Sequence, residues 1–161
     1  MERSTTTWRT KNEVIAIDSR NLKITARWPV APAGQPVAIA LDRQSRRLFV
    51  AGRNPKTLVM MDAGSGRIIG QPLSIGGRVD TNTFDTGTAL AACSTGDGTI
   101  NIFHEDSPGK LSGVERVATE FGAKTMALDP QTHNLLVDTA DFSTPESRPK
   151  PGTFRLLVYG R

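Results

Sequence analysis

The chain has 161 residues, of which 37% are hydrophobic and 22% charged. This composition allows one domain with a hydrophobic core and excludes intrinsic disorder, and no segment has the ~20 consecutive apolar residues that span a bilayer. The net charge of +4 comes from scattered basic residues. Their densest group, Arg43, Arg46, Arg47, Arg53 and Lys56, is interpreted as a solvated hairpin turn and strand edge.

The first eleven residues carry little pattern. Residues 1–11 contain no apolar stretch of the kind found in secretion signals, so the chain as written is expected to stay in the cytoplasm. The threonines at positions 5–7 make a poor core strand and suit only an edge strand. The patterned domain is therefore predicted to run from residue 12 to residue 161.

From residue 12 onward, short apolar runs alternate with polar turns, which is typical of β-hairpins. The first two runs lie at residues 14–18 and 24–28. A set of four follows at residues 37–42, 47–50, 58–62 and 68–73, and a second set at residues 80–85, 89–92, 99–104 and 113–117. The last three lie at residues 124–129, 134–137 and 154–159. This pattern predicts an all-β fold.

An aspartate recurs at the same place in each unit. Asp42, Asp85 and Asp129 lie 43 and then 44 residues apart, each at the end of one run and before a short turn. An aspartate carboxylate there accepts hydrogen bonds from backbone N–H groups of its own turn. We therefore expect a structural role for these residues rather than a catalytic one.

The length of the repeat separates two all-β architectures. Four antiparallel strands in about 43 residues match one blade of a β-propeller, in which successive blades stack face to face. A β-sandwich also has short strands at similar spacing, but it does not usually repeat one aspartate turn at a fixed period. The sequence thus predicts a propeller.

Several stretches resemble the YVTN-repeat, YncE-like β-propeller proteins of bacteria. They are residues 12–18, 40–42, 47–51, 96–100, 104–108, 125–133 and 151–161. The resemblance implies a seven-bladed propeller, often with an export signal, and gives no information about the ligand. This chain is expected to have fewer than seven blades and to lack an export signal, and it is similar to the C-terminal half of such a protein.

The units sum to a partial β-propeller of about three and a half four-stranded antiparallel blades. Two units are complete, one at each end is incomplete, and the proline-rich segment 141–152 is predicted to be an inserted mobile loop. An open arc exposes apolar blade faces. Two explanations stay open: two copies form a homodimer that completes a ring of about seven blades, or the chain is a truncated family member.

A ligand-binding site is predicted at the central channel, where the first strand of each blade begins. Asp80 and Lys124 occupy equivalent positions on neighbouring blades, so we expect them to face the channel and to pair. Arg78, Asn82 and Thr125 flank them. The five residues form either a polar ligand site or a structural arrangement held by an ion pair.

No catalytic, metal or cofactor site is predicted. The single cysteine, Cys93, lies in a strand-like run and is interpreted as a small buried residue. His104 and His133 are placed in turns of different units, without further ligands at metal-binding spacing. The turn at residues 64–67 lacks the full glycine pattern of a phosphate-binding loop.

These observations favour a non-enzymatic binding or scaffold protein with an unknown protein or small-molecule ligand. One alternative is a propeller subunit or domain associated with a redox enzyme. Another is a weak basic nucleic-acid binder, although aromatic residues for base stacking make up only 6% of the chain.

Overall fold

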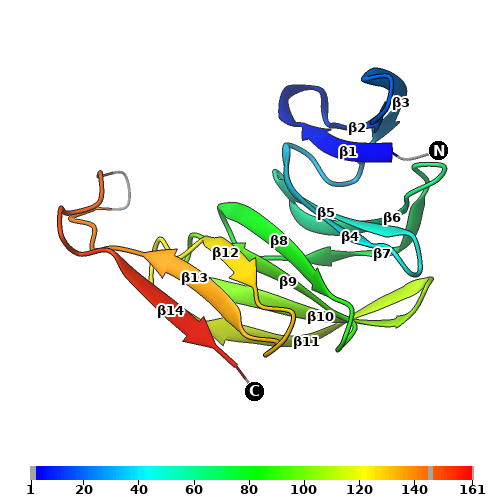
Figure 1. Ribbon diagram of the computed structural model, residues 1–161. Coiled ribbons are helices and arrows are strands. Elements are labelled where there is room, and N and C mark those ends of the chain that lie inside the picture. Colours follow the sequence, from blue (N-terminus) through cyan, green and yellow to red (C-terminus); the bar gives the residue numbers. More distant parts are fainter. Residues whose placement is uncertain (1–2, 145–146, 161) are drawn as a thin grey trace.

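The computed structural model describes residues 3–144 and 147–160 and is all-β (Figure 1). Within these residues, fourteen strands form four antiparallel sheets that follow one another in chain order along an arc. The prediction of about three and a half four-stranded units is confirmed. The described residues contain no helix that is long and apolar enough to cross a membrane.

The two central sheets have four strands each. The second sheet has the order β4-β5-β6-β7, with β4 (Pro36–Asp42), β5 (Arg47–Arg53), β6 (Lys56–Asp62) and β7 (Ile68–Ser74). The third sheet has the order β8-β9-β10-β11, with β8 (Val79–Asp85), β9 (Leu90–Thr95), β10 (Thr99–Ser107) and β11 (Lys110–Ala118). The first strand of each lies on the inner side of the arc, because β4 contacts β8 and β8 contacts β12.

The two end sheets have three strands each, and each lacks a different strand. The first sheet contains β1 (Arg3–Trp8), β2 (Glu13–Asp18) and β3 (Lys23–Pro29), with a 3-10 turn at Arg9–Lys11. The last contains β12 (Thr125–Leu128), β13 (Leu135–Thr139) and β14 (Arg155–Tyr159). By the order of the central sheets, the first sheet lacks its innermost strand and the last its outermost strand.

Strand β1 lies in the segment that was predicted to be poorly patterned. It pairs along its whole length with β2, from Arg3 opposite Asp18 to Trp8 opposite Glu13. The threonine-rich sequence forms a strand here because β2 supplies the hydrogen-bonding edge, and β-branched threonines suit an extended backbone. The patterned fold therefore begins nine residues earlier than the predicted boundary at residue 12.

The core consists of three apolar layers, one between each pair of consecutive sheets. The layer between the first and second sheets centres on Val14, Trp28, Leu48 and Met61. The middle layer centres on Phe49, Leu58, Val79, Cys93 and Phe103, and the ring of Phe49 stacks on Phe84 at 4.9 Å between centroids. The smallest layer, between the third and last sheets, contains Ala92, Ile100, Ala123, Met126 and Val137.

The repeated aspartates form the turns that were predicted. Asp42 accepts the backbone N–H of Gln44 at 2.9 Å, Asp85 that of Gly87 at 2.9 Å, and Asp129 that of Gln131 at 2.9 Å. Burial by itself raises the pKa of the Asp85 carboxyl, but hydrogen bonds from Thr88, Gly87 and His133 more than offset this and lower it. At Asp42, too, hydrogen bonds outweigh burial and lower the pKa of the carboxyl. Their structural role is confirmed.

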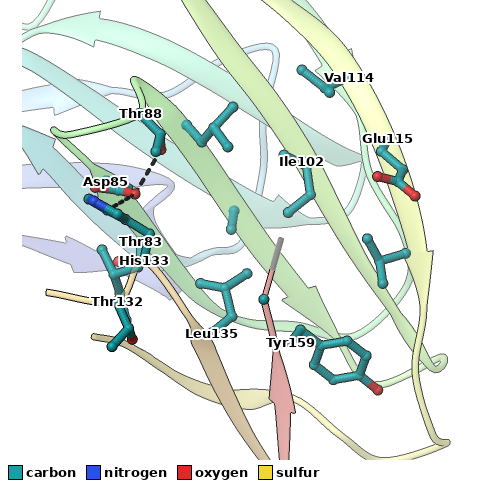
Figure 2. Close-up of a pocket in the computed structure, with 15 residues that line it drawn as sticks. Thr83, Asp85, Thr88, Ile102, Val114, Glu115, Thr132, His133, Leu135 and Tyr159 are labelled. Carbon is teal, nitrogen blue, oxygen red and sulfur yellow. Dashed lines mark hydrogen bonds and ion pairs between the residues drawn. The ribbon is translucent and has the colours of Figure 1, made fainter. Parts of the chain in front are cut away.

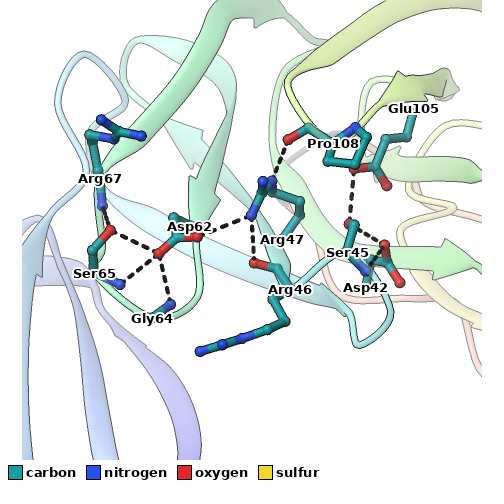
Figure 3. A network of polar contacts seen from close by, with 10 residues as sticks. All are labelled: Asp42, Ser45, Arg46, Arg47, Asp62, Gly64, Ser65, Arg67, Glu105 and Pro108. Carbon is teal, nitrogen blue, oxygen red and sulfur yellow. Dashed lines mark hydrogen bonds and ion pairs between the residues drawn. The ribbon is translucent and has the colours of Figure 1, made fainter.

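The turns also connect neighbouring sheets (Figure 3). Arg47 of the second sheet donates to Asp62 at 3.0 Å and to the carbonyl oxygen of Pro108 in the β10–β11 turn. Ser45 donates to Glu105 of β10 at 3.0 Å. Burial raises the pKa of the Glu105 carboxyl, as does the nearby Asp42 carboxylate. Arg47 is therefore ion-paired and not simply solvated.

The proline-rich segment 141–152 lies between β13 and β14, as predicted. Its ends meet where the N–H of Lys150 donates to the carbonyl of Asp141 at 2.8 Å. The ring of Phe142 packs edge-on against Phe121 at 6.0 Å, and Arg155 pairs with Asp141 at 2.8 Å. Residues 145–146 of this predicted loop lie outside the described residues.

Candidate functional site

A cluster of charged side chains lies at the inner side of the arc, where β8 begins and where the chain enters β12. The Asp80 carboxylate accepts a hydrogen bond from Arg53 Nη2 at 3.1 Å, and Lys124 Nζ lies 3.9 Å from the same oxygen. Arg53 Nε also donates to the Val79 carbonyl at 2.9 Å. The predicted ion pair between Asp80 and Lys124 is therefore confirmed.

Arg78 belongs to the same cluster. It adopts a left-handed backbone conformation with φ of 62°, and its carbonyl accepts the N–H of Gly96 at 3.1 Å. Gly96 has no side chain, and a Cβ there would lie 3.5 Å from both Arg78 Nε and Lys124 Cδ. The guanidinium of Arg78 lies over the Phe121 ring, 5.2 Å from its centroid. Arg53 and Lys124 thus flank the Asp80 carboxylate, and Arg78 lies near Lys124 across Gly96.

The other two predicted ligand residues lie elsewhere. Asn82 is buried, donates to the carbonyl oxygen of Phe49 at 2.8 Å and accepts from the Cys93 thiol at 3.3 Å. Its amide therefore bonds the third sheet to the second. Thr125 is exposed on β12 and pairs with Asp138 of β13. The structure brings together Arg78, Asp80 and Lys124 and leaves Asn82 and Thr125 outside the cluster.

Arg53 is the member that sequence reasoning missed. It was grouped with the scattered basic residues around the second hairpin, yet it ends β5 and reaches across to the next sheet. The position of Arg53 in its unit, rather than its charge, could have identified it from the sequence. A residue at the end of a second strand lies beside the start of the next sheet's first strand, where Asp80 had already been singled out.

A pocket of about 390 Å³ lies between the third and last sheets (Figure 2). Its apolar wall includes Ile102, Val114, Val117, Leu135 and Tyr159. At one side, His133 Nδ1 lies 2.8 Å from the Asp85 carboxylate, which also accepts the Thr88 hydroxyl at 2.7 Å. Burial, and then the nearby Glu120, raise the pKa of the Tyr159 hydroxyl. Sequence reasoning did not find this pocket, because its walls come from two units.

Residues with chemically reactive side chains lie apart from one another. Cys93 is fully buried in β9, as predicted, and burial raises the pKa of its thiol far above the ordinary value. His133 lies in a turn, but His104 lies within β10, where it contacts Asp106 at 2.8 Å, so its predicted placement in a turn was wrong. Among residues 3–144 and 147–160, no three His, Cys, Asp or Glu side chains are grouped as metal ligands would be.

Solved structures place this architecture among β-propellers. A chain of the Kuenenia stuttgartiensis hydrazine synthase matches with a TM-score of 0.78 and 16% identity, over 88% of this chain and 40% of that one. A chain of a mitotic checkpoint complex matches with a TM-score of 0.67 and 17% identity, over 84% of this chain and 41% of that one. The chain is thus a partial β-propeller.

These likenesses extend to the fold alone. No protein-family model matches the chain, and no curated protein sequence matches it. The chain spans about two fifths of the length of the two solved chains. At 16% and 17% identity, the activities of the two complexes do not transfer to it.

Proposed function

We propose that this chain is a non-enzymatic binding module of the YncE-like kind, and that the cluster of Arg53, Arg78, Asp80 and Lys124 holds an anionic group of its ligand. The observation that carries the proposal is the excess of cationic side chains around the Asp80 carboxylate at the inner side of the arc. Carboxylate and phosphate groups are the partners that such a cluster favours.

The arrangement of the cluster supports binding rather than catalysis. Arg53, Asp80 and Lys124 are each about a quarter to two fifths exposed, so a ligand can reach them from solvent. Arg53 is oriented by its bond to the Val79 carbonyl, which gives it a defined position beside the carboxylate. The turn aspartates are already occupied by their own turns, and Cys93 is buried.

The test uses the full chain and a simple anionic probe. Inorganic phosphate is titrated into isotope-labelled protein, and backbone amide shifts are followed by NMR. We expect saturable shifts centred on residues 78–80 and 124, and a loss of affinity of about fivefold or more in Lys124→Gln. The control is Lys150→Gln, which removes the same charge from the exposed segment 141–152.

Two results would contradict the proposal. One is an equal loss of affinity in Lys124→Gln and Lys150→Gln, which would indicate only a general charge effect. The other is the absence of saturable shifts near the cluster. The nucleic-acid alternative has its own measurement, because binding driven by phosphate contacts weakens linearly on a log–log plot against salt.

A further inference from the structure

The β5–β6 hairpin of the second sheet closes with two basic residues directly opposite each other. Arg53 ends β5 and pairs with Lys56, which begins β6, across a two-residue turn. Directly opposite residues lie on one face of a sheet with their Cβ atoms about 5 Å apart, and like charges there repel each other. The pair that closes the corresponding hairpin of the third sheet, Thr95 and Thr99, is uncharged.

Both side chains of this pair reach toward the third sheet, but they meet different surroundings there. Arg53 donates to the Val79 carbonyl and to the Asp80 carboxylate. Lys56 Nζ lies over Gly77, 3.4 Å from the position that a Cβ of this glycine would take. Lys56 is exposed, and it forms no ion pair within residues 3–144 and 147–160. Its charge is therefore available to a ligand beside the charged cluster.

A carboxylate on the other side of Gly77, that of Asp97, is occupied by groups of the third sheet and its entry. It accepts the Gly77 N–H at 2.6 Å and the Thr95 hydroxyl at 2.7 Å, and it pairs with Arg116 at 3.4 Å. Burial by itself raises the pKa of the Asp97 carboxyl, but the hydrogen bonds that it accepts more than offset this and lower it. Asp97 therefore does not neutralise Lys56.

Lys56 continues a line of cations that crosses three sheets. Lys56 lies over Gly77, and Arg78 follows that glycine directly in the chain. Arg78 Nε and Lys124 Cδ each lie 3.5 Å from the position that a Cβ of Gly96 would take. Neither glycine places a side chain between the cations. One ligand can therefore contact cations of the second, third and last sheets together.

We propose, building on the binding function proposed above, that Lys56 forms a second anionic subsite beside the charged cluster, and that the ligand carries linked phosphate groups. One phosphate lies at the cluster, and the next lies beside Lys56. Phosphate suits this place because its three terminal oxygens can accept hydrogen bonds from cations of different sheets. An anion between Arg53 and Lys56 also relieves the repulsion between these two side chains.

The test compares inorganic phosphate with tripolyphosphate, each titrated at constant ionic strength into the isotope-labelled full chain and followed by NMR. Tripolyphosphate is expected to bind at least about tenfold more tightly, because its second phosphate meets Lys56 at a high effective concentration. It is also expected to shift the amides of Gly76 and Gly77, which lie beside Lys56. Phosphate alone is expected to shift mainly residues 78–80 and 124.

Three variants isolate the contribution of this lysine. Lys56→Gln is expected to weaken tripolyphosphate binding by about fivefold or more and to leave the affinity for phosphate within about twofold, which also shows that the variant is folded. Lys56→Arg keeps the charge and is expected to bind both probes as the parent does. Lys23→Gln is the matched control, because it removes an exposed lysine at the far end of the strands, opposite Asp18.

The second subsite is overturned if Lys56→Gln binds tripolyphosphate normally, or if Lys23→Gln loses as much affinity. Citrate tests the class of ligand, because an equal loss of citrate affinity in Lys56→Gln would overturn the assignment to phosphate. ATP without metal ions distinguishes two sources of linked phosphates: tighter binding than tripolyphosphate indicates a nucleotide, and equal binding a free phosphate chain.

The two proposals can fail separately. If phosphate binds near residues 78–80 and tripolyphosphate gains no affinity through Lys56, only the second subsite is wrong. If phosphate gives no saturable shifts near the cluster in the parent chain, the proposed binding function itself is wrong.

Discussion

The two ends of the arc present different faces to solvent. On the first sheet, Arg27 lies 4.7 Å over the ring of Trp8 and pairs with Glu13 at 3.3 Å, so a charged side chain covers part of that sheet. On the last sheet, Phe154, Leu156 and Val158 are 71%, 52% and 60% exposed. Stacked-repeat proteins need a polar cap at each end. The first end is the more polar of the two, with its exposed large apolar side chains at Trp8, Leu22 and Ile24, whereas those of the last end follow one face of a single strand and its approach.

The difference indicates which end is suited to association. A contiguous apolar surface on a soluble protein marks an interaction site or an aggregation risk. The predicted homodimer would join the last sheet of one copy to the first sheet of the other. The described residues of each chain form fourteen strands in four sheets, so two copies supply the strands of seven four-stranded blades, distributed over eight sheets. Whether such a ring forms stays a prediction.

The largest expected effect concerns the packing of the two end sheets. Trp28 is buried between the first and second sheets, so Trp28→Ala is expected to lower the free energy of unfolding by about 3–5 kcal/mol. Tyr159→Ala on the last sheet is expected to cost only about 1 kcal/mol, because that ring borders an open pocket. Urea denaturation of both variants measures the contrast. Equal losses would mean that the two ends are packed alike.

The next effect concerns the link between the third and last sheets. Asp85 accepts bonds from Gly87 and Thr88 in its own turn and contacts His133 of the last sheet. Asp85→Ala leaves these groups without their acceptor and is expected to cost about 2 kcal/mol. Adding His133→Ala to that variant should cost less than His133→Ala alone, as a double-mutant cycle measures. Strict additivity would show that the contact contributes nothing to the junction.

The same carboxylate gives the stability a dependence on pH. The pKa of Asp85 is lowered in the folded chain, so its stabilising contribution is complete above the ordinary aspartate pKa of about 3.9. That contribution is lost as the pH falls through the lowered folded value. Asp42 behaves in the same direction. Unfolding curves recorded from about pH 5 to pH 2 should therefore show a shallower loss of stability in Asp85→Asn than in the parent.

The smallest effect on stability is expected at the exposed face itself. Leu156→Lys with Val158→Lys changes only exposed positions, so the free energy of unfolding should shift by less than about 0.5 kcal/mol. Self-association, followed by light scattering against concentration, should nevertheless fall. Thr6→Lys on the first sheet is the comparison, because it adds a charge to the end that is already polar. A greater reduction of self-association by Thr6→Lys would reverse the assignment of the two ends.

Much of the fold could be predicted from the sequence, because it rests on local patterns. The turn at Asp42 is a short-range feature whose hydrogen bonds close within three residues. For strand β1 the sequence allowed no more than an edge strand, because its threonines carry no alternating apolar signal, and its pairing with β2 decides its structure. The local sequence does not show which strand edge a polar segment will pair with.

The candidate site could be predicted only in part, since it depends on contacts between units. Asp80 and Lys124 were found because they occupy the same position in successive units. Arg53 occupies a different position in its unit, and it reaches Asp80 only because the second sheet packs beside the third. Asn82 lies two residues after Asp80 and has the chemistry of a ligand residue, yet the carbonyl of Phe49 takes its amide. The repeat pattern in the sequence does not show which polar groups form hydrogen bonds between neighbouring blades.

The bond between Asn82 and Phe49 has a consequence for how one sheet is set against the next. Apolar layers are non-directional, so the large middle layer by itself tolerates sliding and rotation of the two sheets. A buried amide that needs one particular carbonyl tolerates neither, because leaving it unsatisfied costs its full desolvation penalty. Asn82 therefore restricts sliding and rotation of the third sheet against the second. Through this one directional bond it helps to set the angle between the two central blades, and so the curvature of the arc.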